Sequence, residues 1–113
     1  MLPTRSFAHA AGALALAFAL TAAPSFAGDA AASTIVMAKD FMFAPTSLTI
    51  KSGSTVTWTN EDDEPHTVVN DAGLFRSGAM DTNESFSFRF DKPGTYHYAC
   101  SIHPRMVGTI VVQ

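Results

Sequence analysis

Residues 85–90 read SFSFRF, and aromatic and polar side chains alternate without a break through this stretch. In an extended strand successive side chains point to opposite faces of the sheet, so the three phenylalanines would share one face. The two serines and the arginine would then share the other face, toward solvent. The stretch therefore predicts a β-strand whose inner face is aromatic and buried.

The same alternation recurs in short runs along the rest of the chain. Val56 and Trp58 alternate with threonines in TVTWTN, residues 55–60. Turn-forming residues separate the runs, and no amphipathic helical stretch of useful length follows residue 27. We expect strands at residues 33–38, 47–52, 55–60, 66–69, 85–90, 95–100 and 108–113. Two inner faces of this kind predict an all-β domain, an antiparallel sandwich or barrel with two sheets packed over one core.

The first 27 residues have the pattern of an export signal. Arg5 is followed by an apolar run over residues 10–23. Small residues stand at the positions before the cleavage site that a signal peptidase recognises, and Ala27 is the last of them. The run is shorter than the ~20 residues that span a bilayer, so a membrane anchor is the weaker alternative. We expect a secretory signal peptide at residues 1–27, cleaved after Ala27. A single domain at residues 28–113 would then reach the periplasm without a membrane anchor.

Charge and cysteine content narrow the function of this domain. Cleavage would remove Arg5 and leave six basic against ten acidic residues, a net charge of −4, which disfavours nucleic acid as a partner. A domain this small buries only about 60–65% of its unfolded surface, and an exported one usually gains stability from a disulfide. The chain has one cysteine, Cys100. Cys100 is therefore either a free thiol or committed to another kind of bond.

Three residues with soft or nitrogen donors follow one another closely in CSIHPRM, residues 100–106. His103 and Met106 stand at i+3 and i+6 from Cys100, and His66 lies upstream at the start of an expected strand. Taken singly, a histidine at a strand edge and a methionine have ordinary structural explanations. Two imidazoles, one thiolate and one thioether together are the ligand set of a blue copper site. We therefore assign His66, Cys100, His103 and Met106 as the ligands of one copper ion that cycles between Cu(I) and Cu(II).

Other metal and cysteine chemistries fit this set less well. Structural zinc prefers four Cys or His ligands, and Met is a poor zinc ligand. A binuclear copper centre needs a second cysteine, and c-type haem needs Cys-x-x-Cys-His. A cysteine nucleophile beside an imidazole is the enzymatic alternative, but no acid is placed to orient His103 and Met106 has no role in it. We therefore expect that the protein is not an enzyme. We also expect His97, which lies on the opposite face from Cys100, to be exposed or structural.

The blocks GSTVTWTNEDDEPHTV (53–68) and GTYHYACSIHPRMVGTIVV (94–112) resemble those of cupredoxins. The two-residue intervals from Cys to His and from His to Met resemble the short ligand loop of amicyanins. The resemblance implies a Greek-key cupredoxin fold and a soluble, monomeric periplasmic carrier that transfers one electron by an outer-sphere route. It also implies redox partner proteins, with a periplasmic dehydrogenase as donor and a c-type cytochrome or oxidase as acceptor, and His103 as the electron port. A periplasmic copper-binding or delivery protein is the alternative.

The resemblance also implies contacts around the ligands. Asn60 would hydrogen-bond toward Ser101 and tie the two ligand loops together, and the N–H of Thr67 would point at the Cys100 sulfur. Two residues depart from the amicyanin pattern. Ile102 stands in the stretch where amicyanins usually have proline, so the resemblance does not fix the reduction potential. Arg105 puts a charge on a docking surface that is normally apolar. We expect the acidic residues 61–64 to form a solvated loop, with steering of basic partners as the alternative.

Overall fold

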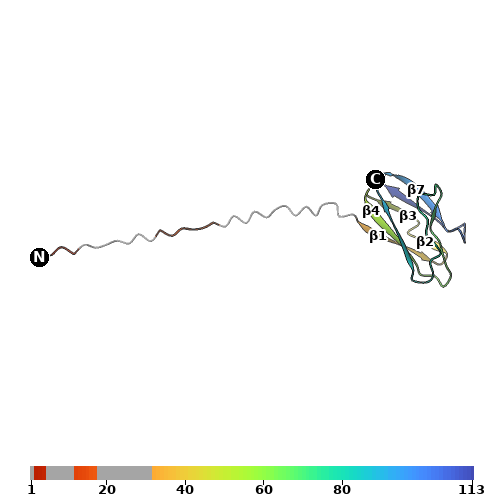
Figure 1. Cartoon of the computed structure of the whole chain (residues 1–113), viewed down its shortest axis with the longest axis horizontal. Helices are drawn as coiled ribbons and strands as arrows, with labels where there is room; N and C mark the ends of the chain where they lie inside the picture. The colour runs from red at the N-terminus through yellow and green to blue at the C-terminus, as the bar shows by residue number, and fades with distance from the viewer. Residues whose placement is uncertain (1, 5–11, 18–31) are drawn as a thin grey trace.

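The computed structural model describes residues 2–4, 12–17 and 32–113, and the β domain occupies the last of these ranges (Figure 1). Its strands are β1 (Ser33–Lys39), β2 (Met42–Ala44), β3 (Ser47–Ile50), β4 (Ser54–Asn60), β5 (Val69–Asn70), β6 (Ser85–Phe90), β7 (Gly94–Ala99) and β8 (Val107–Val112). No residue between 32 and 113 lies in a helix, so the expected all-β class is confirmed. The predicted cleavage after Ala27 lies outside the described residues. None of the described ranges contains a helix long and apolar enough to cross a membrane.

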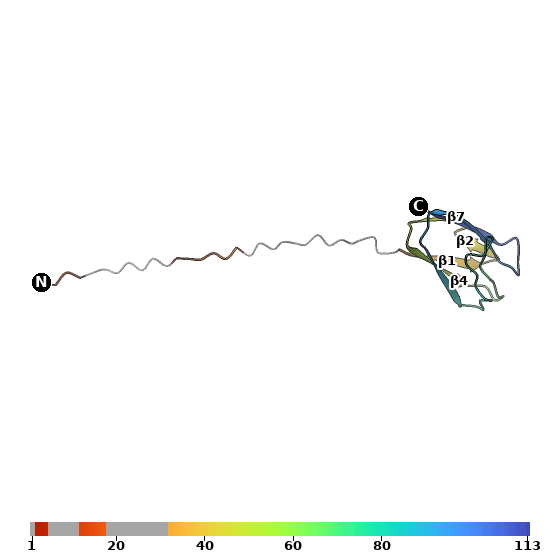
Figure 2. The ribbon, with the colours of Figure 1, turned by 45° about the horizontal axis from the view of Figure 1, so that its top comes forward.

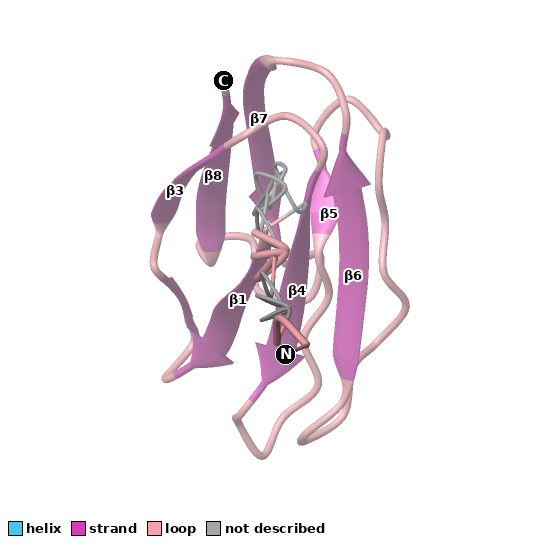
Figure 3. Ribbon diagram, turned by 90° about the vertical axis from the view of Figure 1, so that its left-hand side faces the viewer, coloured by secondary structure: helices cyan, strands magenta, loops and turns pink. Residues whose placement is uncertain are grey.

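The strands form two four-stranded sheets that pack as two layers, visible in Figures 2 and 3. The first sheet has the order β2-β1-β4-β6 and the second the order β3-β8-β7-β5. Two strand pairs depart from the antiparallel pairing that we expected, because β1–β4 and β3–β8 are parallel. After β2 the chain crosses to the second sheet as β3 and returns as β4 in the direction of β1. Side-chain alternation defines the two faces of a strand but not the direction of its neighbour, so it could not predict these pairs.

The predicted strand at residues 66–69 is also largely wrong. His66 pairs only through an isolated bridge with Met80, and β5 begins at Val69. The short strand β2 was not predicted, because three residues are too few for alternation to be recognised. The other six expected strands are present, with ends that differ by two residues or fewer.

The core between the sheets is built around Trp58, which is fully buried in the middle of β4. Its indole ring packs against the rings of Phe75, Phe86, Phe90 and Tyr98, with centroid separations of 5.4 to 6.4 Å. The phenylalanines of β6 face this core as expected, although only Phe90 is fully buried because β6 is an edge strand. A rigid aromatic core of this kind gives the loops at the end of β7 a fixed base.

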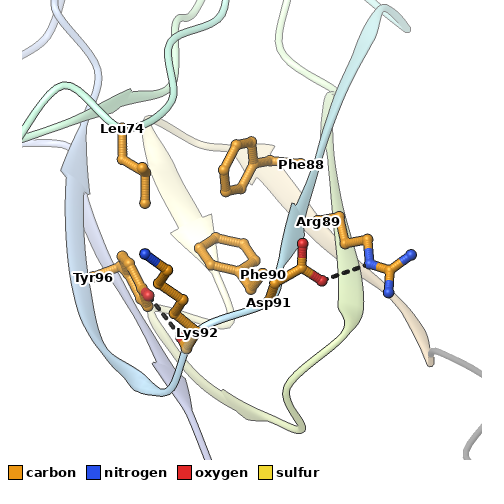
Figure 4. A pocket seen from close by; sticks show the side chains of 7 residues that line it. All are labelled: Leu74, Phe88, Arg89, Phe90, Asp91, Lys92 and Tyr96. Carbon is orange, nitrogen blue, oxygen red and sulfur yellow. Dashed lines mark hydrogen bonds and ion pairs between the residues drawn. The ribbon is translucent and has the colours of Figure 1, made fainter.

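A small cavity of about 190 Å³ opens beside the connection between β6 and β7 (Figure 4). Its lining consists of Leu74, Phe88, Arg89, Phe90, Asp91, Lys92 and Tyr96. An ion pair between Arg89 and Asp91 and a hydrogen bond from the Tyr96 hydroxyl to the Lys92 carbonyl close its rim. The cavity adjoins the first half of β7, whereas three of the four predicted metal ligands, Cys100, His103 and Met106, follow the last residue of that strand.

Candidate metal centre

Three of the four predicted ligands converge on one point. The Nδ1 atoms of His66 and His103 are 3.2 Å apart, and the Cys100 sulfur lies 3.9 Å from the first and 3.7 Å from the second. Two donors that share one metal ion at typical N and S bond lengths are at most about 4.4 Å apart. All three separations are shorter than this limit. The two imidazoles and the thiol can therefore bind a single ion without a rearrangement of the chain.

The fourth predicted ligand, Met106, is brought to the same end of the domain by the loop between β7 and β8. The N–H of Cys100 donates to the carbonyl of Met106, and the N–H of Met106 donates to the carbonyl of His103, each over 2.9 Å. These two bonds close residues 100–106 into a compact ring. Met106 is buried, with 3% of its surface exposed. The short Cys–His–Met spacing thus has a structural purpose, since it places three predicted ligands on one small loop.

His66 is held on both its backbone and its side chain. Its N–H and carbonyl exchange hydrogen bonds with Met80 over 3.1 and 2.8 Å. Its ring is completely buried, and Nε2 lies 2.7 Å from the Oδ2 atom of Asp62. With one ring nitrogen committed to Asp62, the other is free to face Cys100 and His103.

Asp62 is the residue of this site that the sequence did not single out. Its carboxylate accepts hydrogen bonds from the backbone N–H groups of Asp40 (2.7 Å) and Phe41 (3.0 Å) as well as contacting His66. Burial alone raises the pKa of Asp62, but the bonds from Phe41, His66 and Asp40 outweigh burial and lower the pKa. The expected solvated loop is therefore wrong for Asp62, whose side chain is only 12% exposed. Glu61, Asp63 and Glu64 are exposed as expected.

The Cys100 thiol is buried among hydrogen-bond donors. As expected, the N–H of Thr67 points at the sulfur, over 3.3 Å. Burial alone raises the pKa of Cys100, but the N–H groups of Thr67, His103 and Ile102 outweigh it and lower the pKa from 9.0 to about 6. A thiol of this kind is largely ionised at neutral pH, and the thiolate is the form that binds metals.

The expected link between Asn60 and Ser101 is wrong. The Asn60 amide donates instead to the carbonyls of Glu64 (2.8 Å) and Met80 (2.9 Å), and its oxygen accepts the N–H of Asp62. Asn60 therefore organises the acidic loop internally.

The two ligand loops are tied by Thr67. Its hydroxyl accepts the N–H of Ser101 and is also hydrogen-bonded to the Ser101 hydroxyl, each over 2.8 Å. The Thr67 hydroxyl thus makes the link between the ligand loops that the resemblance to cupredoxins implied for Asn60.

His103 is the most exposed of the four predicted ligands, with 26% of its side chain accessible. A shallow hollow around it is lined by Phe41, Ile102, Pro104, Arg105 and Met106. On the other side, Glu64 approaches within 3.5 Å of the His103 Nε2 atom. As expected, Arg105 places a charge beside the apolar residues of this hollow.

His97 lies away from this cluster. Its ring is exposed, and its Nδ1 atom is 3.1 Å from the Thr109 hydroxyl on the neighbouring strand. The expectation that His97 is exposed or structural is confirmed.

Comparison with known proteins identifies the family. Residues 30–113 match the model of the copper binding proteins of the plastocyanin/azurin family. The chain belongs to this family. Amicyanin-alpha of Methylorubrum extorquens is 38% identical to it over 93 residues, 74% of either chain. A plastocyanin of Scenedesmus fuscus is 42% identical over 85 residues, which cover 64% of this chain and 87% of the plastocyanin.

Solved cupredoxin structures share the fold. A purple cupredoxin from Nitrosopumilus maritimus superposes with a TM-score of 0.67 at 32% identity and covers 71% of this chain and 99% of its own. A reduced amicyanin variant gives a TM-score of 0.69 at 33% identity, over 77% of this chain and 88% of its own. The expected resemblance to amicyanins is confirmed. As a cupredoxin, the chain belongs to a family of electron carriers that bind one copper, and His66, Cys100, His103 and Met106 form a candidate type 1 copper site.

Proposed function

We propose that the protein is a soluble periplasmic electron carrier that transfers one electron by an outer-sphere route. In this proposal His66, Cys100, His103 and Met106 are the ligands of one copper ion. The observation that carries it is the convergence of two Nδ1 atoms and one sulfur from segments 34 residues apart. The proposal includes a signal peptide at residues 1–27 and a single, monomeric domain at residues 28–113.

Copper bound at this site supplies a couple between Cu(I) and Cu(II). The protein contributes fixed donors and exclusion of water. His66 and Cys100 are fully buried and Met106 nearly so, and each is tied by backbone hydrogen bonds that do not depend on the metal. Because these ligands are held by the fold, little of the chain has to move when the charge of the site changes by one.

His103 provides the route for the electron to reach a partner. It is the one proposed ligand whose ring reaches the surface, and apolar side chains from Phe41 and Ile102 stand beside it. A partner that docks on this hollow would approach the copper through a single imidazole. Arg105 and Glu64 add charges of opposite sign to the rim, so they would select among partners. We propose a periplasmic dehydrogenase as donor and a c-type cytochrome or oxidase as acceptor.

The burial of the ligands also supports a carrier over a copper delivery protein. Delivery requires ligands that a recipient can reach, whereas three of the four proposed ligands are inaccessible here.

Voltammetry of the purified, copper-loaded protein tests the proposal. We expect a reversible one-electron wave with one copper per chain. A protein that holds only Cu(I), without colour and without a reversible wave, would support copper delivery and overturn the proposed electron carrier.

A further inference from the structure

The turn after β1 has an unusual backbone. Asp40 and Phe41 both adopt positive φ angles, 52° and 56°, although neither is glycine. Such conformations are unfavourable for residues other than glycine and persist where surrounding contacts hold them. In this turn the two successive N–H groups point toward a common point and form a concave anion-binding nest. The anion in this nest is the carboxylate of Asp62.

The same carboxylate contacts the buried ring of His66. The Nε2 atom lies 2.7 Å from Asp62 Oδ2, and no solvent reaches the ring. Because an ionised carboxylate only accepts, Nε2 carries the proton and Nδ1 carries the lone pair. Nδ1 is the atom that faces Cys100 and His103.

The nest also determines where Phe41 lies. With its backbone held by Asp62, the Phe41 ring meets His66 edge to face at 5.4 Å and His103 at 4.9 Å, with interplanar angles of 86° and 88°. One aromatic ring thus packs against both imidazoles. His103 has no carboxylate as close as that of His66, so the packing of the Phe41 ring is a further restraint on its orientation.

We propose that Asp62 is a positioning residue of the copper centre. Held by the amides of Asp40 and Phe41, it fixes His66 with the proton on Nε2 and keeps Phe41 against both imidazoles. The inference depends on the proposed function only in taking the bound metal to be copper. The protonated nitrogen of His66 and the packing of Phe41 are properties of the metal-free chain.

Nitrogen NMR of the histidine rings in the metal-free protein tests the first part. In the natural protein we expect the His66 signals of a single Nε2–H tautomer and close proton contacts from Phe41 to both imidazoles. Asp62→Ala should give a mixture of tautomers at His66 and lose the contacts to Phe41. Asp63→Ala removes a neighbouring exposed acid and should leave both signatures unchanged. An unaltered His66 tautomer in Asp62→Ala would overturn the inference.

Copper affinity, measured by competition with a chelator, tests the consequence. Loss of a carboxylate behind a metal-bound histidine typically costs 10–100-fold in affinity, and we expect at least about 10-fold for Asp62→Ala. Asp62→Asn keeps one acceptor and should fall between Asp62→Ala and the natural protein; it also serves if Asp62→Ala does not fold. A copper affinity equal to that of the natural protein in both variants would contradict this role of Asp62. If the natural protein bound no copper, the proposed function would fail, while the NMR result would still decide the role of Asp62.

Discussion

The backbone N–H of Thr67 donates to the sulfur of Cys100 over 3.3 Å, and so joins segments 33 residues apart. Thr67 directly follows His66, so the chain that presents one proposed ligand also provides a hydrogen bond to another. Its hydroxyl accepts the N–H of Ser101, directly after Cys100. One threonine therefore fixes the spacing between the two ligand loops from both its backbone and its side chain.

Replacement of Thr67 by valine keeps the shape and the N–H but removes the hydroxyl. We expect a loss of about 1 kcal/mol in the free energy of unfolding, because the Ser101 N–H loses its acceptor. The reduction potential should also fall, since the hydroxyl lies 3.8 Å from the sulfur as a weak donor that disfavours Cu(II). Urea titration and voltammetry measure the two effects. Thr57→Val, which removes a hydroxyl paired with Ser87 on the outer face of β4, should leave the potential unchanged; equal shifts in both variants would contradict the role of Thr67.

The thiol of Cys100 should make the stability of the metal-free protein depend on pH. Its pKa in the folded protein is about 6 against an ordinary value of 9.0. A lowered pKa contributes stability that is fully present above pH 9 and is lost as the pH falls through about 6. The difference in unfolding free energy between the natural protein and Cys100→Ser should therefore shrink across this interval as acid is added. Parallel pH profiles for the two proteins would show that the thiol pKa is not lowered.

Gly108 has no room for a side chain. It pairs with Tyr98 across β7 and β8, and a Cβ added to it would overlap the hydroxyl and Cζ of Tyr98 and lie 2.8 Å from Cε1. The tyrosine ring is buried against Trp58 and cannot move aside. We expect Gly108→Ala to lower the free energy of unfolding by about 1–3 kcal/mol. Gly78→Ala is the matched control because nothing lies within 4 Å of its added Cβ; a midpoint of thermal unfolding as high for Gly108→Ala as for Gly78→Ala would refute the steric argument.

We expect steering of partners to come from the exposed acids of the 61–64 loop rather than from Asp62. Glu64 stands 3.5 Å from the His103 ring. Glu64→Gln should slow electron exchange with a basic cytochrome at low ionic strength, and the difference should vanish as salt screens the charge. Asp71→Asn removes one charge near His97 instead and should change the rate less. Equal stopped-flow rates for Glu64→Gln and the natural protein at low salt would leave Glu64 without a steering role.

The parts of the site that the sequence predicted are those with local spacing. Cys100, His103 and Met106 lie on one loop whose length alone brings them together, and the alternation around Trp58 predicted which faces are buried. Asp62 could not be recognised, because its role depends on amides more than twenty residues upstream that meet it only in the folded chain. For the same reason Thr67 was missed as the link between the loops. The parallel strand pairs arise because the chain crosses from one sheet to the other between strands, and local sequence patterns do not predict such crossings.

The visible absorption spectrum of the protein loaded with one equivalent of Cu(II) is the most direct test of the proposed copper site. The account requires an intense band from the Cys100 thiolate bound to copper, together with its disappearance in Cys100→Ser. The spectrum should be accompanied by a count of one copper per chain. A weak spectrum in the natural protein, or an intense band that survives in Cys100→Ser, would contradict the assignment of His66, Cys100, His103 and Met106 as a type 1 copper site.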